Sequence, residues 1–390
     1  MKRASLRGRS GVRLASVTAV GVLALGALAA CGSSNNNSNA TSTSTGTGGG
    51  GGAASGQVAV GVILPDAVSS PRWEGQDRPN LTKAFAAAGL KSDIQNAGGD
   101  TAKFGQLCDS MINEGVSVLL TVNLDPNSGK ACLQKAAQAG VKTIDYDRLT
   151  PGGGASYYVS FNNVKVGELM GQGLSACLTA EGKTKANIVY VDGAATDNNA
   201  ALFKQGYEAA LKPKISSGAY KLVGDQSGQW DATKAANVFD QMYTQNNGNI
   251  DGIISANDTM AGGIIARLKA DGVAGKVPIT GQDASIQGLQ YIMQGYQCGT
   301  VYKNTTLEAD AASKLAIDLI KGDTSAANAM VNGQTMDPTT HQNVPSVLET
   351  PVWVTKSSVK KVIADGQEPY AQVCSGSFAQ LCQKDGVTKP

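Results

Sequence analysis

The sequence predicts an α/β protein whose parallel sheets are doubly wound with helices and divided between two lobes. Short apolar runs typical of strands alternate with longer helical stretches, and this alternation indicates βαβ units and parallel sheets. About 334 residues follow a glycine-rich segment near the N-terminus, which is more than a single hydrophobic core usually organises. Seven of the apolar runs end at clusters of polar or aromatic residues, so the predicted sheets have a polar edge.

The first 31 residues have the pattern of an export signal. Five basic residues, at positions 2, 3, 7, 9 and 13, precede an apolar stretch over 14–30 that is too short and too rich in small residues for a membrane span. The end of this stretch, residues 28–31, resembles a bacterial lipobox. The resemblance implies cleavage of a signal peptide, residues 1–30, and a diacylglycerol on the thiol of Cys31. We therefore expect an extracytoplasmic lipoprotein on the outer face of the cell membrane; a secretory signal with a chance cysteine is the alternative.

Residues 31–56 predict a flexible linker. They are almost entirely Gly, Ser, Thr, Asn and Ala, a composition with little apolar surface to bury. The glycine run at 48–52 is not a phosphate-binding loop, because no strand precedes it and no helix follows. Cleavage of the signal removes five of the 33 basic residues and none of the 31 acidic ones. The remaining 28 basic and 31 acidic residues give a net charge of −3. This balance, without basic blocks, argues against nucleic acid as a partner.

The apolar runs and the helical stretches follow one another along the chain. The runs that end at polar clusters cover residues 58–64, 141–144, 188–191, 222–223, 253–254, 277–280 and 301–302. The helical stretches cover residues 101–114, 128–139, 164–178, 199–211, 231–246, 260–270 and 306–321. In an open parallel sheet the carboxyl ends of the strands face the ligand crevice. Residues that follow the runs should therefore converge on one place.

The cysteines predict disulfide bonds. Those after Cys31 are Cys108, Cys132, Cys177, Cys298, Cys374 and Cys382. An even number outside the cytoplasm favours disulfides, and fifteen pairings are possible. Cys108 and Cys132 would lie on successive crossover helices on one face of a sheet, and Cys374 with Cys382 would close a small C-terminal loop. If these two pairs form, the cysteines that remain are Cys177 and Cys298.

The sequence offers little for catalysis or for a metal. The single histidine, His341, lies in a polar stretch, and there is no C-x-x-C motif. A G-x-S-x-G motif is absent, and residues 182–184 lack the earlier glycine of a phosphate-binding loop. We expect no enzyme, no metal and no cofactor. A glycosidase that uses Asp147 and Asp283 as its two carboxylates is the enzyme alternative.

Several segments carry a family resemblance. They are residues 72–73, 146–148, 158–167, 197–200, 224–226, 256–258, 281–284 and 300–303. In order and spacing, these segments resemble the D-xylose-binding proteins of bacterial ABC transporters, which belong to the ribose/galactose branch of periplasmic binding proteins. The likeness runs from about residue 58 to about residue 366. It implies a type I periplasmic-binding-protein fold, two lobes joined by three crossings that close on a monosaccharide and deliver it to a permease.

The resemblance also implies a set of sugar-binding residues. They are Arg72, Trp73, Asp147, Arg148, Asn198, Asn199, Lys204, Trp230, Asn257, Asp283 and Lys303. Carboxylates accept hydrogen bonds, guanidinium and ammonium groups donate, and amides do both, so such a set can fix a pattern of hydroxyl groups. The mixed signs fit a neutral sugar, whereas a sugar phosphate would call for a more uniformly basic pocket. The two indoles would cover the C–H faces of the ring.

Some of these residues have a structural alternative. Asp197, Asp258 and Asp283 each precede a predicted helix, where an aspartate is typically an N-cap. We assign Asp197 and Asp258 to caps and Asp283 to the sugar. Lys204 stands where the family has arginine, which donates in a fork that lysine cannot reproduce. The segment before Trp230 is shorter than in the family, which leaves the place of this indole open.

The predicted domains follow from the resemblance. One lobe would comprise residues 57–161 and 304–333, the other residues 162–303 and 334–366, with a C-terminal tail over 367–390 that holds a disulfide. Hinges would lie at residues 162–163 and 303–304. We expect a monomeric binding protein for D-xylose; the alternatives are ribose, arabinose, galactose or glucose, or a sugar-sensing receptor component. A sugar-responsive repressor would need a helix-turn-helix in place of the lipobox.

Overall fold

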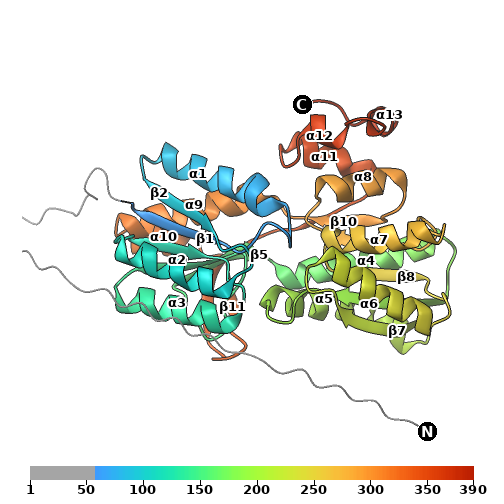
Figure 1. Ribbon diagram of the computed structural model, residues 1–390, viewed down its shortest axis with the longest axis horizontal. Helices are drawn as coiled ribbons and strands as arrows, with labels where there is room; N and C mark the ends of the chain where they lie inside the picture. Colours follow the sequence, from blue (N-terminus) through green and yellow to red (C-terminus); the bar gives the residue numbers. More distant parts are fainter. Residues whose placement is uncertain (1–57) are drawn as a thin grey trace, which may run out of the picture. The chain divides into compact units, whose positions relative to one another are not determined.

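The structure is a computed structural model that describes residues 58–390 (Figure 1). The predicted signal peptide, Cys31 and the linker over 31–56 lie outside the described residues. Within residues 58–390, no helix is both long and apolar enough to cross a membrane. The strands of this range form one seven-stranded sheet and two three-stranded sheets.

The first lobe is built on the seven-stranded sheet. Its strand order is β11-β12-β5-β4-β3-β1-β2, and all neighbours are parallel except β11 and β12. The strands are β1 (Val60–Leu64), β2 (Ser92–Asn96), β3 (Val118–Thr121), β4 (Lys142–Tyr146), β5 (Tyr157–Phe161), β11 (Gly333–Met336) and β12 (Asn343–Glu349). Every residue of β1, β3 and β5 is buried, as expected for strands that are covered on both faces.

Helices cover both faces of this sheet. They are α1 (Arg78–Ala87), α2 (Thr101–Asn113), α3 (Pro126–Gln138), α9 (Thr305–Ile320) and α10 (Thr324–Ala329). Figure 1 shows α1 and α9 on one face and α2 and α3 on the other. Successive residues of a strand point to opposite faces, so Val62 packs in the cluster that holds Phe85 of α1, and Ile63 in the cluster that holds Phe104 of α2.

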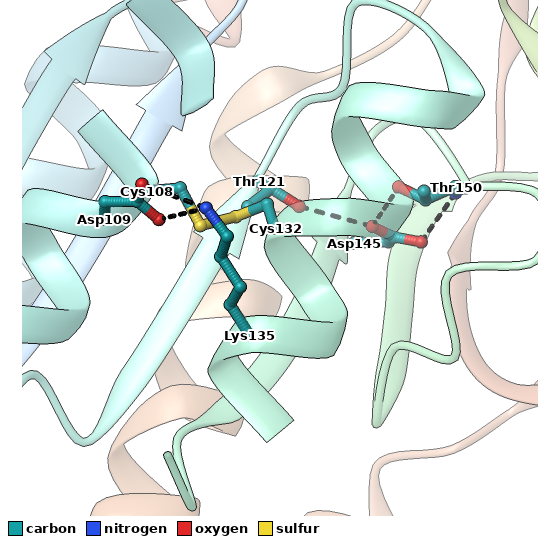
Figure 2. The surroundings of a disulfide bond; sticks show 7 residues. All are labelled: Cys108, Asp109, Thr121, Cys132, Lys135, Asp145 and Thr150. Atoms are coloured by element: carbon teal, nitrogen blue, oxygen red, sulfur yellow. Dashed lines mark hydrogen bonds and ion pairs between the residues drawn. A yellow bond between two sulfur atoms is a disulfide. The ribbon is translucent and has the colours of Figure 1, made fainter. Parts of the chain in front are cut away.

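A disulfide joins the two helices on the second of these faces. Cys108 of α2 is bonded to Cys132 of α3, and both residues are buried (Figure 2). Lys135 and Asp109 form an exposed ion pair beside the bond, with 2.7 Å between Nζ and Oδ1. Farther along the sheet, Asp145 of β4 accepts hydrogen bonds from the backbone and the hydroxyl of Thr150 (Figure 2).

The second lobe holds the two smaller sheets, with strand orders β7-β6-β8 and β13-β10-β9. The strands are β6 (Ala186–Asp192), β7 (Tyr220–Ser227), β8 (Gly252–Ser255), β9 (Thr280–Gln282), β10 (Gly299–Tyr302) and β13 (Val352–Val354). A parallel bridge between Ile253 and Ile279 connects the two sheets. Only β13 runs antiparallel to its neighbour, β10. The lobe therefore has one continuous, mostly parallel sheet with a bridge at its centre.

The helices of the second lobe include two in very close contact. These helices are α4 (Asn163–Ala180), α5 (Asn198–Ser216), α6 (Ala232–Gln245), α7 (Asp258–Ala270) and α8 (Ile286–Gln294), whereas the π-helical turn η1 (Trp73–Asp77) belongs to the first lobe. Helices α4 and α5 approach each other at Gly167 and Gly206. A Cβ atom at Gly167 would lie 1.9 Å from the carbonyl oxygen of Phe203, and one at Gly206 would lie 2.1 Å from that of Val164. Any other residue would push the two helices apart.

The chain passes between the lobes three times. It crosses at Asn162 after β5, at residues 303–304 after β10, and at residues 350–351 between β12 and β13. The sequence-based boundary at 333–334 is wrong, because β11 and β12 pair in the seven-stranded sheet. β12 lies parallel to β5, with Ser346 opposite Tyr158, before the chain returns to the second lobe.

The C-terminal segment is part of the second lobe rather than a separate tail. Helices α11 (Val359–Ala364), α12 (Tyr370–Val373) and α13 (Phe378–Lys384) follow the short η2 (Lys356–Ser358). Cys382 and Val373 are buried in one cluster with Leu289 and Ile292 of α8. Cys374 is bonded to Cys382, and Cys177 of α4 to Cys298 just before β10. The three pairs are those that the sequence favoured.

Candidate functional site

A small cavity lies between the two lobes, where the carboxyl ends of their strands meet. Its lining is polar and aromatic, and comes from Ser69, Ser70, Arg72, Trp73, Asp147, Arg148, Asp197, Asn199, Phe203, Trp230, Asn257, Gln282, Asp283 and Lys303. The free space between these side chains is about 30 Å³, which is room for about one water molecule. The space is small because side chains of the two lobes bond to one another across it.

Arg72 and Asp147 form one side of the cavity. Nη1 of Arg72 lies 2.8 Å from Oδ2 of Asp147, and both side chains are buried. Lys303, at the end of β10, approaches the same oxygen with Nζ at 3.3 Å. Burial alone would raise the pKa of Asp147, but Lys303, Arg72 and Arg148 together hold this pKa well below its ordinary value. Asp147 is therefore an ionised acceptor under neutral conditions.

The backbone at Asp147 is shaped to present this carboxylate. Its φ of 61° lies in the left-handed region, which aspartate tolerates better than most residues. Three donors hold its carbonyl oxygen: the hydroxyls of Tyr158 and Ser160, each at 2.8 Å, and Nδ2 of Asn199 at 2.9 Å. The surroundings thus fix an uncommon backbone conformation at the end of β4, as often happens at functional sites.

Arg148 and Asp197 join the lobes on the next side. Nε of Arg148 lies 2.9 Å from Oδ2 of Asp197, and Nε1 of Trp230 donates to the same oxygen at 3.1 Å. The other oxygen of Asp197 accepts from the backbone N–H of Asn199 at 2.9 Å and caps α5. The sequence assigned Asp197 to the cap alone, whereas the structure places it both at the cap and on the cavity.

Three aromatic rings line the cavity. The guanidinium carbons of Arg72 and Arg148 lie 4.5 Å and 5.5 Å from the centre of the Trp73 ring. Phe203 and Trp230 meet edge to face, with 6.3 Å between their ring centres. The sequence did not point to Phe203. The helical period would have found it, since Phe203 lies one turn beyond Asn199 on α5.

Two more lining residues of the second lobe, Asp283 and Asn257, form hydrogen bonds with the first lobe. Oδ2 of Asp283 accepts from the hydroxyl of Ser70 at 2.8 Å, and Nδ2 of Asn257 donates to the carbonyl oxygen of Ser69 at 2.9 Å. Lys303 Nζ lies 3.6 Å from Oδ1 of Asp283. The two serines were not predicted, because they lie in an irregular loop after β1 that carries no periodic signal.

Two predicted site residues lie elsewhere. Lys204 does not line the cavity and binds Asp192, the last residue of β6, at 2.7 Å and Asp225 of β7 at 2.6 Å. Asn198 is the first residue of α5 and does not line the cavity, although its neighbour Asn199 does. The other nine predicted residues all line it.

Asp258 has a different role from the predicted helix cap. Asn257 is the N-cap of α7, because its Oδ1 accepts from the backbone N–H of Met260 at 2.9 Å. The buried carboxylate of Asp258 instead accepts from the backbone N–H of Ser285 at 2.8 Å, from Gln297 at 2.7 Å and from Thr300 at 2.8 Å. Asp258 therefore ties α7 to the loop that follows Asp283. The backbone of that loop is unusual, because Asp283 is a non-glycine residue with a positive φ of 100°.

The described residues contain no group of three or more His, Cys, Asp or Glu side chains that could hold a metal ion. The site instead combines three cationic side chains with three carboxylates. The cations are Arg72, Arg148 and Lys303, and the carboxylates Asp147, Asp197 and Asp283. Such a balanced set is suited to hydrogen bonding with a neutral, hydroxyl-rich molecule.

Comparisons with known proteins agree with this arrangement. A family model described as a periplasmic binding protein domain matches residues 60–324. The D-xylose-binding periplasmic protein of Escherichia coli is 36% identical over 312 residues, which cover 80% of this chain and 91% of the relative. The multiple sugar-binding periplasmic receptor ChvE of Rhizobium radiobacter is 34% identical over 337 residues, with 80% and 91% covered.

A solved structure shows the same fold. An ABC transporter solute binding protein from Clostridium phytofermentans, with bound beta-D-glucose, superposes with a TM-score of 0.71 at 26% identity, covering 80% of this chain and 99% of the other. The type I fold predicted from the sequence is confirmed, and the relatives are transport proteins rather than glycosidases. The chain belongs to the family of periplasmic sugar-binding proteins of ABC transporters.

Proposed function

We propose that this protein captures D-xylose at the cavity between its lobes and delivers it to an ABC permease while a lipid on Cys31 holds it at the membrane. The relative from Escherichia coli, named for D-xylose, supports the choice of sugar. The family also includes receptors for several sugars and a protein with bound glucose, so a hexose or another pentose is the second candidate. The lipobox pattern supports the anchor.

One observation carries the proposal for the ligand: three cations and three carboxylates from both lobes alternate around a single small cavity. A hydroxyl group both donates and accepts, so each can bridge a guanidinium or ammonium group and a carboxylate. The pairs Arg72–Asp147 and Arg148–Asp197 would each engage one edge of the sugar. A phosphorylated sugar would meet the carboxylates and be repelled.

Binding requires the lobes to move. A sugar ring needs several times the free space of about 30 Å³, so the lobes separate at the three crossings and close again around the ring. The hydrogen bonds of Ser70 with Asp283 and of Asn257 with Ser69 join the lobes in the closed arrangement. Trp73 and Trp230 would then cover the apolar faces of the sugar.

Calorimetry of the domain from Gln57 onward against D-xylose, ribose, arabinose, galactose and glucose tests the ligand. We expect D-xylose to bind with a dissociation constant in the micromolar range, about −8 kcal/mol, which a ligand of about ten heavy atoms can supply. If another aldose binds more tightly, that sugar and not D-xylose is the ligand. No binding of any of the five would overturn the proposed function.

The anchor is tested separately. A Cys31→Ala variant, expressed in its own cell envelope with a radioactive fatty acid, should carry no label, and the lipidated form should disappear from the membrane fraction. Equal labelling of the variant and the natural protein would rule out the lipid on Cys31.

A further inference from the structure

A second layer of charged residues lies behind Arg72, away from the cavity. It consists of Asp77, at the end of η1, and Glu308, on the first turn of α9. Both carboxylates are fully buried, and neither belongs to the lining of the cavity. Burying charges costs free energy unless they are paired, so carboxylates in such a place need a role.

Both carboxylates bind the Arg72 side chain. Asp77 accepts from Nε at 2.8 Å and from Nη2 at 2.7 Å, the two-pronged geometry that arginine favours with carboxylates. Glu308 accepts from Nη2 through its Oε2. Since Asp147 takes one N–H of Nη1, four of the five N–H groups of Arg72 are used. The N–H that remains belongs to Nη1, the nitrogen that lies on the cavity side with Asp147.

Other parts of the first lobe hold these two residues in turn. The hydroxyl of Tyr146, at the end of β4, donates to Oδ1 of Asp77. Glu308 is placed by α9, which begins two residues after Lys303, at the second crossing between the lobes. A helix, a strand and a π-helical turn therefore fix one orientation of the Arg72 guanidinium.

The surroundings of Glu308 disfavour its ionised form. Burial raises the pKa of Glu308 well above its ordinary value, and Arg72 only partly offsets this, because Asp147 and Asp77 add negative charge nearby. Oε1 of Glu308 has no hydrogen-bond partner among the described residues, which agrees with a neutral carboxylic acid rather than a second buried anion.

We propose that Asp77 and Glu308 are positioning residues of the sugar site, which hold Arg72 so that its free Nη1 N–H meets a sugar hydroxyl without either carboxylate touching the ligand. The inference rests on the proposed function. It implies that affinity for the sugar depends on two residues that do not contact it. Without them the Arg72 side chain would be mobile, and fixing it when the sugar binds would cost conformational entropy.

The test compares Asp77→Asn, Glu308→Ala and Glu308→Gln with an Asp145→Asn control. Asp145 is also a buried carboxylate of the first lobe, but it binds Thr150 and Thr121 rather than Arg72. Sugar affinity is measured by calorimetry and stability by urea unfolding. We expect Asp77→Asn and Glu308→Ala to weaken binding about tenfold or more, and Glu308→Gln to restore most of the affinity because it keeps an acceptor for Nη2.

The control should lose stability but keep its sugar affinity within about twofold. A folded Asp77→Asn variant that binds as tightly as the natural protein would overturn the inference. So would an equal loss of affinity in Asp145→Asn, since the effect would then be a general result of destabilisation. If the natural protein binds no sugar at all, the proposed function fails, and that outcome is distinct from a failure of the positioning role.

A double-variant cycle adds a second measure. In an Arg72→Lys background, the lysine cannot donate the two-pronged pair of hydrogen bonds to Asp77, so the Asp77→Asn change should cost less than about threefold in affinity. If Arg72→Lys binds the sugar too weakly to be measured, the single variants and the recovery of affinity in Glu308→Gln test the positioning role. An undiminished effect of Asp77→Asn in the lysine background would show that Asp77 acts by some other route.

Discussion

Asp147 and Lys303 connect the two lobes directly, although 156 positions separate them in the sequence: Nζ of Lys303 lies 3.3 Å from Oδ2 of Asp147. Asp147 directly follows β4 of the first lobe, and Lys303 directly follows β10 of the second. Each side chain is only 4% exposed. A buried ion pair adds little net stability over an apolar pair, so its presence at the meeting point of two lobes favours a role in binding.

Truncation of the charged lining residues should weaken sugar binding. We expect Asp147→Ala, Arg148→Ala and Asp283→Ala each to cost about 1–3 kcal/mol of binding free energy, about five- to over a hundredfold in affinity, because a buried partner is left unpaired. The variants should still fold, since these side chains line the cavity rather than a hydrophobic core. Calorimetry on protein with a native circular dichroism spectrum gives the comparison.

Lys204→Ala is the matched control for this series. Lys204 was predicted as a sugar ligand, but it binds Asp192 and Asp225 outside the cavity. Its truncation should leave the affinity within about twofold of the natural value. If Lys204→Ala lost affinity while the three lining variants kept it, the proposed site would be wrong.

Asp258→Ala should destabilise the fold more than the loss of a helix cap would. Truncation leaves three donors without their acceptor, on Ser285, Gln297 and Thr300, and we expect a loss of about 3 kcal/mol or more in the free energy of unfolding. Asp231→Ala provides the comparison. Asp231 is a simple N-cap of α6, and its loss should cost about 1 kcal/mol. Equal costs in urea unfolding would contradict the role assigned to Asp258.

Stability should fall as the pH rises toward neutrality. Burial raises the pKa of Asp145 and of Asp258 to about 7, from an ordinary value of 3.8. Between these values the folded protein keeps protons that the unfolded chain releases, so the free energy of unfolding decreases with increasing pH. The contribution is complete below the ordinary pKa and is lost as the pH passes about 7.

Urea unfolding at about pH 5 and about pH 8 measures this decrease. The lowered pKa of Asp147 acts at lower pH and does not interfere in this window. Asp145→Asn removes one buried acid with a raised pKa and should show a smaller decrease than the natural protein. A steeper decrease in this variant would contradict the assignment of the raised pKa to Asp145.

The strand-end rule explains why most of the site could be predicted. Asp147, Asn257, Asp283 and Lys303 each follow an apolar run closely, and parallel strands bring their carboxyl ends to one edge. The rule places residues near that edge but does not orient side chains. The family resemblance, and not this rule, predicted Lys204, which lies on α5 and is bound by two acidic residues on neighbouring strands.

Residues that depend on tertiary packing could not be predicted in this way. Glu308 lies on a helix 236 positions from Arg72, and nothing local in the sequence links the two. Strand β11 has no buried residue, and β12 alternates between exposed and buried positions only over its first four residues, so neither strand has a strong apolar run. Their place in the first lobe depends on pairing with β5, a long-range contact that periodicity does not show.

The three disulfides should contribute unequally to stability. Cys177 and Cys298 are 121 positions apart, whereas Cys374 and Cys382 are 8 apart. By loop-closure entropy alone, replacing the first pair by serine should cost about 5 kcal/mol and the second about 2.5 kcal/mol. Urea unfolding of the two double variants gives the order, and mass spectrometry of the non-reduced protein should find no free thiol among the six cysteines. Several alkylatable thiols in the folded protein would contradict these pairings.

The C-terminal segment should influence sugar binding without touching the site. Gln367 lies in the segment that packs on α8 of the second lobe, yet its Oε1 accepts from the backbone N–H of Thr305, the first residue of α9, at 3.0 Å. Its Nε2 donates to Gln76 of η1 at 2.9 Å. Both partners belong to the first lobe. These hydrogen bonds therefore join the two lobes, and we expect them to break when the lobes open.

Removing a bond that exists only in the closed arrangement shifts the equilibrium toward opening, and a smaller closed fraction lowers the apparent affinity in proportion. We expect Gln367→Ala to weaken sugar binding about three- to tenfold, mainly through faster dissociation, because a net hydrogen bond contributes about 0.5–1.5 kcal/mol. Stopped-flow measurements of tryptophan fluorescence give the dissociation rate. Gln383→Ala, at an exposed position of α13 in the same segment, is the control and should dissociate at the natural rate. Identical rates for Gln367→Ala and the natural protein would show that these cross-lobe bonds do not contribute to closure.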